Sequence, residues 1–245
     1  MDKKDISIII PCYNCEETLT EAVESCFLQG LENFEVVLVD DASKDGTKKV
    51  MQCLASTHKE IQLFYHHKNQ GGGATRNTAM KHTSADVIFC LDSDDILPAG
   101  TLFKMLSFLK EKQADAVGIN RSIKFKGANK DDIDHVDTFS YAGESIPFES
   151  LLQKDGVMCP LYSTFMITKE AFLVTGGYPT THGFDTQGFA WRFLMHGLTA
   201  YTCRDAEYLH RIDFHPSYYM REYNAGKINY NWQLVLEEFV VAFSE

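Results

Sequence analysis

The 245-residue sequence has no uninterrupted apolar run of the roughly 18 residues that a membrane-spanning helix needs. Its N-terminus, Met-Asp-Lys-Lys-Asp, leads directly into a predicted strand, so we expect no signal peptide. We therefore expect a cytoplasmic protein, and a position at the inner face of the membrane is left open.

The sequence also lacks an excess of positive charge. It has 23 basic against 34 acidic residues and a formal net charge of -11. This balance argues against a global basic face for nucleic acid or anionic lipid. We expect no nucleic-acid partner.

A second pair of closely spaced cysteines is missing as well. The chain has seven cysteines, an odd number, and Cys12 and Cys15 resemble half of a redox or zinc motif that has no second half. The favoured interpretation is that the cysteines are small apolar side chains in a reducing compartment.

What is present is a first half that alternates apolar strands with helical segments. Strands are predicted at residues 6–11, 34–40, 61–66, 86–91 and 115–119, and helices at 16–29, 45–57, 73–83 and 100–112. This alternation is typical of βαβ units and predicts an α/β fold with a parallel, doubly wound sheet.

The second half is less regular. Residues 124–146 are polar and predict a hairpin or surface excursion, followed by a strand at 161–167, a helix beginning at Thr168 and an aromatic helix after Asp185. The tail at 230–243 is predicted to be a helix that is apolar around most of its circumference, so it must pack on something. Its own domain or a partner subunit is favoured over a membrane, because its polar positions are acidic.

An acidic run, Asp92-Ser93-Asp94-Asp95, directly follows the apolar strand at 87–91. Carboxylates this close repel one another unless a positive group lies between them. Mg²⁺ takes one or two protein carboxylates and completes its shell with substrate phosphates. Ligands bind at the carboxyl ends of strands in open α/β sheets, so the run predicts metal-assisted chemistry on a phosphorylated substrate.

Two further motifs follow predicted strands. Asp41 can accept hydrogen bonds from a nucleobase or ribose if Ser43 or Asp45, rather than Asp41, caps the next helix. The glycines at 71–73 open a helix that carries Arg76, and they are interpreted either as a close approach to a ligand or as a flexible turn.

The candidate residues in the second half of the sequence each have two interpretations. His210, Arg211 and His215 form a group of cationic or metal-capable side chains that is interpreted equally as ligands or as structural residues. Asp185 is either the cap of the aromatic helix or a general base held near an acceptor hydroxyl.

Together these motifs resemble the family 2 glycosyltransferases, an inverting group with the nucleotide-binding GT-A fold. The resemblance spans residues 6 to about 217 and rests on Pro11-Cys12-Tyr13-Asn14, Asp40-Asp41, Asp45-Gly46-Thr47, Asn69-Gln70-Gly71, Ala74, Arg76-Asn77, Asp92-Ser93-Asp94, Gly176-Gly177-Tyr178, Arg192, His210, His215 and Ser217. It implies a GT-A sheet with a smaller acceptor-side region and a C-terminal helix.

The resemblance also implies roles for particular residues. Pro11, Tyr13 and Asp41 would bind the uridine end of the donor, and Arg76 would lie near it. Asp92 would contact the ribose or organise the metal site, with Ser93 beside it in the donor site. Asp94 would coordinate Mg²⁺ or Mn²⁺ at the donor diphosphate, and His215 would complete these contacts.

The base is where the chain departs from the family pattern. Counting back from Arg192, the family's base falls on Thr186 and the preceding acid on Asp185. A one-residue slip in this loop makes Asp185 the catalytic base, with His182 as the next candidate.

The resulting prediction is an inverting, metal-dependent glycosyltransferase that moves a sugar from a UDP-sugar to a glycan or glycolipid acceptor in surface-polysaccharide or glycolipid synthesis. Residues 1–120 would bind the nucleotide sugar, 121–225 the acceptor, and 226–245 would form a C-terminal helix for homo-oligomer or peripheral membrane contact. The alternatives are a catalytically silent nucleotide-sugar or glycan-binding protein and a sugar-nucleotide nucleotidyltransferase.

Overall fold

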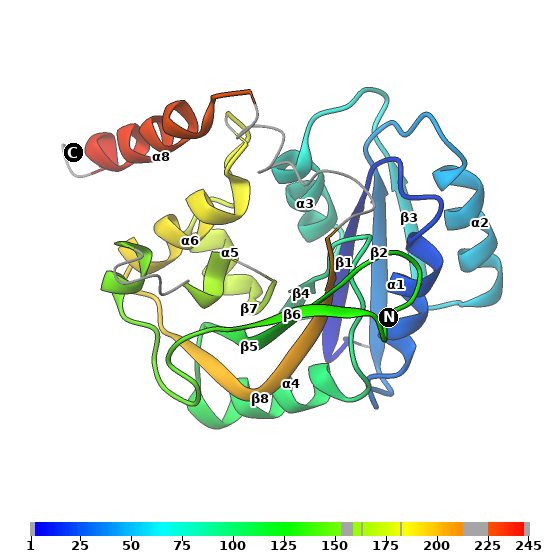
Figure 1. Ribbon diagram of the computed structural model, residues 1–245, viewed down its shortest axis with the longest axis horizontal. Helices are drawn as coiled ribbons and strands as arrows, with labels where there is room; N and C mark the ends of the chain where they lie inside the picture. Colours follow the sequence, from blue (N-terminus) through cyan, green and yellow to red (C-terminus); the bar gives the residue numbers. More distant parts are fainter. Residues whose placement is uncertain (1–2, 153–158, 163, 182, 213–224, 243–245) are drawn as a thin grey trace.

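A single mixed sheet runs through the protein in the computed structural model, which describes residues 3–152, 159–162, 164–181, 183–212 and 225–242 (Figure 1). The strand order is β3-β2-β1-β4-β7-β5-β6, with β8 also paired to β5. The strands are β1 (Ile6–Cys12), β2 (Phe34–Asp40), β3 (Ile61–Tyr65), β4 (Val87–Cys90), β5 (Ala116–Phe125), β6 (Ile133–Thr138), β7 (Phe165–Thr168) and β8 (Ala200–Arg211).

The first four strands are parallel, as the alternating sequence pattern predicts. In the register of β1 with β2, Ile6 lies opposite Phe34 and Cys12 opposite Asp40, so the two strands end together. Every residue of β2 is buried, which explains why its central residues, 36–39, form a continuous apolar run rather than an alternating pattern.

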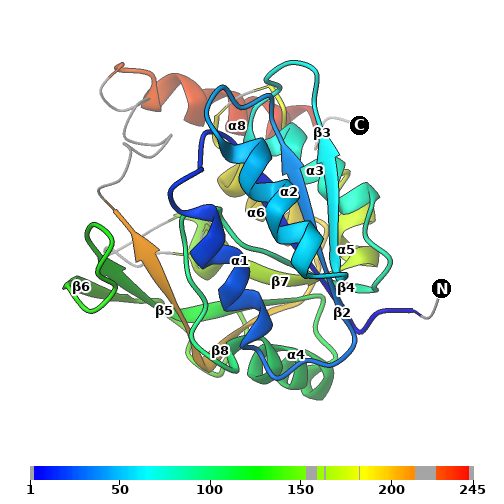
Figure 2. The ribbon, with the colours of Figure 1, turned by 90° about the vertical axis from the view of Figure 1, so that its right-hand side faces the viewer.

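Helices cover both faces of this sheet. Helices α1 (Leu19–Phe27), α2 (Thr47–Thr57) and α4 (Thr101–Lys112) contribute to the core on one face. Helices α3 (Gly72–Lys81), α5 (Lys169–Val174) and α6 (Asp185–Met195) contribute to the core on the other (Figure 2). The predicted doubly wound α/β sheet is therefore confirmed.

The second half adds antiparallel strands to the same sheet. β7 pairs antiparallel with β4 and β5, and β6 forms a hairpin with β5, as expected for the polar segment at 124–146. The strand predicted at 161–167 is shorter, because residues 160–162 form a 3₁₀ turn and the strand begins at Phe165. A second short 3₁₀ segment, η1, covers Phe148–Leu152.

The long strand β8 is a finding that the sequence interpretation missed. It lies parallel to β5, which itself extends beyond the predicted 115–119. Leu209 of β8 also pairs with Ile96, directly after the acidic run. β8 therefore brings His210 and Arg211 to the edge of the sheet where the acidic run lies.

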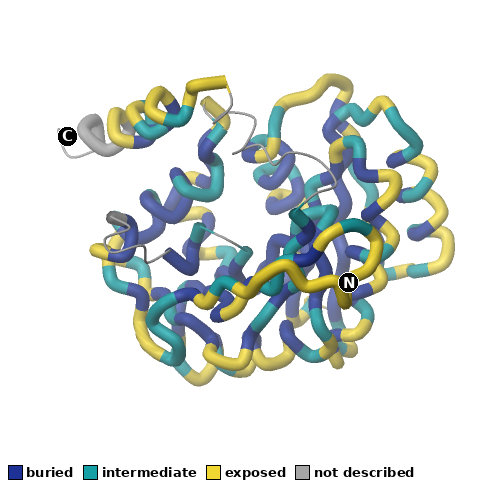
Figure 3. Tube along the Cα trace, in the orientation of Figure 1, coloured by how far each residue is buried: buried dark blue, intermediate teal, exposed yellow. Residues whose placement is uncertain are grey.

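The C-terminal helix α8 (Ile228–Ala242) packs on its own domain. Its Val235 is buried in the same core cluster as side chains of α6, and Ile228 and Trp232 pack against that cluster. Figure 3 shows buried and exposed positions interspersed along this helix. Within the described ranges we find no helix with the length and apolar character to cross a bilayer.

Candidate active site

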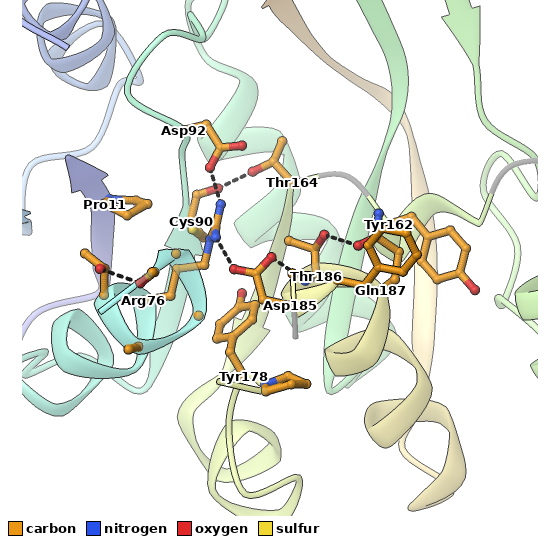
Figure 4. A pocket seen from close by; sticks show the side chains of 18 of the residues that line it. Pro11, Arg76, Cys90, Asp92, Tyr162, Thr164, Tyr178, Asp185, Thr186 and Gln187 are labelled. Carbon is orange, nitrogen blue, oxygen red and sulfur yellow. Dashed lines mark hydrogen bonds and ion pairs between the residues drawn. The ribbon is translucent and has the colours of Figure 1, made fainter. Parts of the chain in front are cut away.

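The carboxyl ends of β1, β2 and β4 open into one cleft of about 1430 Å³. Pro11 lines it near the end of β1, Tyr13 directly after β1, Asp41 after β2, and the acidic run after β4. The second half contributes Asp185 and Tyr162. In Figure 4 Pro11 and Tyr162 lie at opposite sides of the view, with Arg76, Asp92 and Asp185 between them.

Asp41 is almost fully buried and lines this cleft after β2. Its Oδ1 accepts hydrogen bonds from His66 Nδ1 at 2.7 Å and the Gln70 amide at 2.8 Å, and its Oδ2 accepts from the Gly71 amide at 2.8 Å. A carboxylate offers about four acceptor positions. Within the described residues, Oδ2 therefore keeps one acceptor position for a ligand.

Asp45, rather than Asp41, supports the start of α2, as the sequence interpretation required. Its carboxylate accepts from the Thr47 amide at 3.0 Å, and Gly46 occupies the cap position. The second acid of the pair, Asp40, is fully buried and accepts from the Ser43 amide at 3.1 Å. Asp41 is thus the acid of this pair that lines the cleft.

The acidic run forms a tight turn in which negative charge accumulates. Burial, followed by the charges of Asp95 and Asp92, raises the pKa of Asp94 to about 7. Asp92 is half exposed and bonded to Arg76, and the Ser93 carbonyl accepts from the Thr18 hydroxyl at 2.9 Å. Asp94 is the carboxylate whose charge is least compensated by the protein.

This donor set is suited to a hard divalent cation. Carboxylate oxygens are the ligands that Mg²⁺ and Mn²⁺ prefer, and a cation would relieve the repulsion that raises the pKa of Asp94. Among the described residues no three His, Cys, Asp or Glu side chains are placed to hold a metal by themselves. Asp92 and Asp94 therefore fit a metal whose shell is completed by substrate phosphates, and His215 lies outside the described residues.

The third acid, Asp95, binds to β8 and was not singled out from the sequence. Its carboxylate accepts from the Arg211 amide at 3.2 Å and lies 3.2 Å from His210 Nδ1. Burial opposes a charge on His210, but the carboxylates of Asp95 and Asp94 outweigh it and raise its pKa to about 9. His210 is thus a half-buried, positively charged partner of the acidic turn.

Arg211 has a structural role. It is buried, donates to Glu21 at 2.6 Å and to the Asp94 carbonyl at 3.2 Å, and stacks over the Phe125 ring. The residues of the predicted cationic group at 210–215 therefore have different roles. Of its described members, His210 lines the cleft and Arg211 ties β8 to α1 and the acidic turn.

Arg76 joins the two halves of the cleft (Figure 4). One guanidinium nitrogen is 2.6 Å from Asp92 and another is 2.6 Å from Asp185, a residue 109 positions away in the sequence. The guanidinium also lies 5.8 Å from the centroid of the Tyr178 ring. Because the Arg76 side chain is largely buried and its guanidinium pairs with both carboxylates, it holds them at a defined separation.

Asp185 is the first residue of α6 rather than its cap, which is Phe184. Its Oδ1 accepts from the Thr186 amide at 2.9 Å and its Oδ2 from Arg76, and the side chain stays 17% exposed. Each carboxylate oxygen therefore keeps a position for a further donor. Thr186 also lines the cleft, but a hydroxyl cannot accept a proton as readily as a carboxylate near neutral pH.

The glycines at 71–73 all line the cleft, so the interpretation as a close approach to a ligand stays a prediction. Gly73 also has a packing role. A side chain on Gly73 would place its Cβ 2.1 Å from the Pro179 carbonyl oxygen and 3.1 Å from Asp185 Cβ. Glycine at this position lets the start of α3 pack directly against the loop that carries Asp185, and Gly73 therefore helps to position the candidate base.

Gly73→Ala tests this packing. Alanine normally stabilises a helix relative to glycine by about 1 kcal/mol. Here we expect the opposite, a loss of about 1–3 kcal/mol with a lower Tm, because backbone atoms must move. Gly72→Ala is the control, since its Cβ would meet only the ends of the Arg76 and Asp185 side chains. A raised Tm for Gly73→Ala would contradict the proposed packing.

Several cleft residues were not predicted from the sequence. Those at the end of the cleft beyond Asp185 are Tyr162, Lys227, Tyr230, Asn231, Trp232 and Leu234. Their only sequence signal is that the C-terminal helix is rich in aromatic residues. Cys12 and Cys15 are buried free thiols, in agreement with the favoured interpretation of the cysteines.

A mixed, mostly parallel α/β sheet with acids at its strand ends around one cleft is the arrangement of a GT-A type transferase. Residues 7–174 match the description "Glycosyl transferase family 2". The chain belongs to this family, and the fold is the GT-A fold. This assignment sets aside the nucleotidyltransferase alternative.

Individual relatives are also described as glycosyltransferases. The "Putative glycosyltransferase EpsE" of Bacillus subtilis (strain 168) is 29% identical over 217 residues, covering 85% of this chain and 73% of EpsE. The Escherichia coli enzyme UDP-Glc:alpha-D-GlcNAc-diphosphoundecaprenol beta-1,3-glucosyltransferase WfgD is 32% identical over 162 residues, covering 65% of this chain and 59% of WfgD.

A solved structure shows the same fold. S. aureus TarS 1-349 in complex with UDP-GlcNAc aligns with a TM-score of 0.67 and 25% identity, covering 84% of this chain and 58% of the TarS chain. The chain thus spans less than two thirds of both WfgD and the TarS fragment.

Proposed function

We propose that this glycosyltransferase moves a sugar from a UDP-sugar to an acceptor hydroxyl with inversion at the anomeric carbon, in cell-surface polysaccharide or glycolipid synthesis. The main observation behind this proposal is that one guanidinium, that of Arg76, forms ion pairs with both Asp92 and Asp185. Asp92 is at the candidate diphosphate site, and Asp185 is the candidate base. The two carboxylates line one cleft but have different surroundings. Such a pair suits two roles, activation of the donor by one carboxylate and activation of the acceptor by the other.

The donor end is assigned from shape and hydrogen bonding. Pro11 and the half-exposed Tyr13 offer flat surfaces for a uracil ring, and Asp41 Oδ2 can accept from its imide N–H. Support for uridine also comes from the TarS complex with UDP-GlcNAc and from the UDP-Glc in the name of WfgD. The same name describes an acceptor linked to diphosphoundecaprenol, which supports a glycolipid acceptor here.

The diphosphate would lie against Asp92 and Asp94, with a divalent metal held between these carboxylates and the phosphates. Such a metal stabilises negative charge on the leaving diphosphate. Ser93 lies between the two acids on the same turn. Because Asp94 is half-buried among like charges, metal binding would also remove the tendency of this carboxylate to hold a proton.

Asp185 would act on the acceptor. Its carboxylate accepts the proton of the acceptor hydroxyl while that oxygen forms a bond to the anomeric carbon. The bond from this carbon to the diphosphate oxygen breaks, and UDP leaves with the electron pair. A single displacement of this kind inverts the anomeric configuration.

The test is release of UDP from a panel of UDP-sugars, with and without Mg²⁺ or Mn²⁺ and with simple glycosides as acceptors. We expect metal-dependent UDP release that increases with acceptor, and a product of inverted anomeric configuration by NMR. A protein that binds UDP-sugars but releases no UDP above background would instead be the catalytically silent binder.

Asp41→Ala is expected to weaken UDP and UDP-sugar binding equally. A hydrogen bond to a charged group contributes about 1.5–3 kcal/mol, and Asp41 faces the nucleoside rather than the sugar. Isothermal titration calorimetry with both ligands measures the change, and a thermal melt checks that the loop held by Asp41 remains folded. Unchanged UDP affinity would remove Asp41 from the site.

A further inference from the structure

The cleft is larger than one nucleotide sugar requires. Its volume of about 1430 Å³ exceeds the roughly 300–1,000 Å³ of typical small-molecule sites. The described residues with assigned donor roles all lie on the side of Pro11, Asp41 and Asp92. The region beyond Asp185, toward Tyr162, is therefore available to a second ligand (Figure 4).

One stripe of the C-terminal helix faces this region. Lys227, Tyr230, Asn231 and Leu234 all line the cleft. Lys227 directly precedes α8, and the others follow at the i+3, i+4 and i+7 positions, which lie on one side of a helix. The helix thus presents a cationic group, a phenol, an amide and an apolar side chain along one wall. We call these four residues the α8 stripe.

Two further aromatic rings close the end of the cleft. The Tyr162 hydroxyl accepts from Trp191 Nε1 at 2.8 Å and donates to the Leu151 carbonyl at 3.0 Å, so its hydroxyl is used within the protein. Trp232 packs against Tyr162 with ring centroids 6.2 Å apart and against Phe184 at 5.2 Å. These contacts fix the rings, and both Tyr162 and Trp232 stay half-buried at the cleft wall.

Fixed aromatic rings beside polar side chains suit a pyranose ring. A pyranose has apolar C–H groups on its faces and hydroxyls around its edge, so it can stack on an aromatic ring while its edge is hydrogen-bonded. A nucleobase could also stack, but its place is at the opposite end of the cleft. If α8 only packed against its own domain, its aromatic side chains would be expected to be buried. Tyr230, which lines the cleft, is instead 59% exposed.

We propose that the α8 stripe, with Tyr162 and Trp232, is the acceptor subsite and binds a pyranose ring of the acceptor glycan. This inference rests on the proposed function, because it takes Asp185 as the base. The subsite would hold the acceptor sugar beyond Asp185 and direct one hydroxyl toward its carboxylate. α8 would thus determine acceptor specificity without contacting the donor.

Tryptophan fluorescence gives a direct test. The chain has two tryptophans, the buried Trp191 and the cleft residue Trp232. The probes are the methyl glycosides of glucose and N-acetylglucosamine, titrated in the presence of UDP. We expect a saturable fluorescence change with at least one probe, and its loss in Trp232→Phe.

Variants of Tyr230 separate binding from folding. Tyr230→Ala should weaken the titrated affinity about 3- to 10-fold, while Tyr230→Phe keeps the ring and should retain it. Leu236→Ala is the matched control, because Leu236 is 48% exposed on the same helix but does not line the cleft. UDP affinity, measured by calorimetry, should be the same in all these variants.

The outcomes are separable from those of the proposed function. If UDP binds normally but neither glycoside changes the fluorescence, or if Tyr230→Ala and Leu236→Ala behave alike, the acceptor subsite is wrong while the donor assignment stands. If Leu236→Ala instead abolishes binding to vesicles containing anionic lipid and Tyr230→Ala leaves glycoside affinity intact, α8 is a membrane contact. Absence of both UDP binding and UDP release would overturn the proposed function itself.

Discussion

Asp185→Asn should reduce sugar transfer by about 10²–10⁴ and leave UDP binding nearly unchanged. The amide cannot accept the proton of the acceptor hydroxyl, whereas Pro11, Tyr13 and Asp41, the proposed nucleoside contacts, line another part of the cleft. Arg76 retains its ion pair with Asp92, so the site should keep its shape. Single-turnover transfer rates, compared with UDP affinity for the same variant, measure the effect.

Glu170→Gln serves as the control for that substitution. Glu170 also lies in the first turn of a helix, α5, but it is exposed and does not line the cleft. Its neutralisation should not alter transfer. If Asp185→Asn transfers sugar at the parent rate, Asp185 only orders the start of α6, and the base is another group. His182, the next candidate from the sequence, lies outside the described residues.

Asp94→Asn should remove most metal-dependent donor binding and lower turnover by a large factor, with folding intact. The reason is that Asp94 supplies a carboxylate whose charge is least compensated by the protein, and without it the diphosphate charge is left exposed. The stability of the variant should not fall, because the substitution also removes repulsion with Asp95 and Asp92. Calorimetry of UDP binding with and without Mn²⁺ is the measurement.

Asp86→Asn provides the comparison for Asp94→Asn. Asp86 directly precedes β4 at the end opposite the acidic run and forms an exposed ion pair with Lys3. This control should bind UDP and metal as the parent does. Turnover by Asp94→Asn at the parent rate, with the same sensitivity to EDTA, would show that the metal is held elsewhere.

The sequence was most informative where local chemistry decides the structure. The strands Ile6–Cys12 and Phe34–Asp40 contain the buried apolar runs 8–10 and 36–39, so their position could be predicted from hydrophobicity. Their parallel pairing could be predicted from the helices that alternate with them. The acidic run after β4 is likewise a local feature, because its carboxylates are adjacent in the chain wherever the rest folds.

Strand β8 shows where this reasoning fails. Its burial alternates irregularly through Cys203-Arg204-Asp205-Ala206, where its pairing with β5 shifts register. An irregular strand of this kind has no clear period of two residues, and it becomes a strand because β5 is there to pair with it. The contact of Asp95 with His210 depends on that pairing and has no signal in the sequence.

The sequence by itself determined the α/β class, the family and the acidic character of the strand ends, because these follow from apolar runs and motifs a few residues long. Only the tertiary structure decided that Arg76 pairs with both Asp92 and Asp185, that the start of α3 packs at Gly73 against the Pro179 loop, and that one stripe of α8 faces the cleft. Apart from the Arg76–Asp92 pair, whose residues are 16 positions apart, these contacts join segments that are distant in the chain, and sheet order and helix packing set their mutual placement. Sequence periodicity reports which side of an element is buried, but not which element it meets.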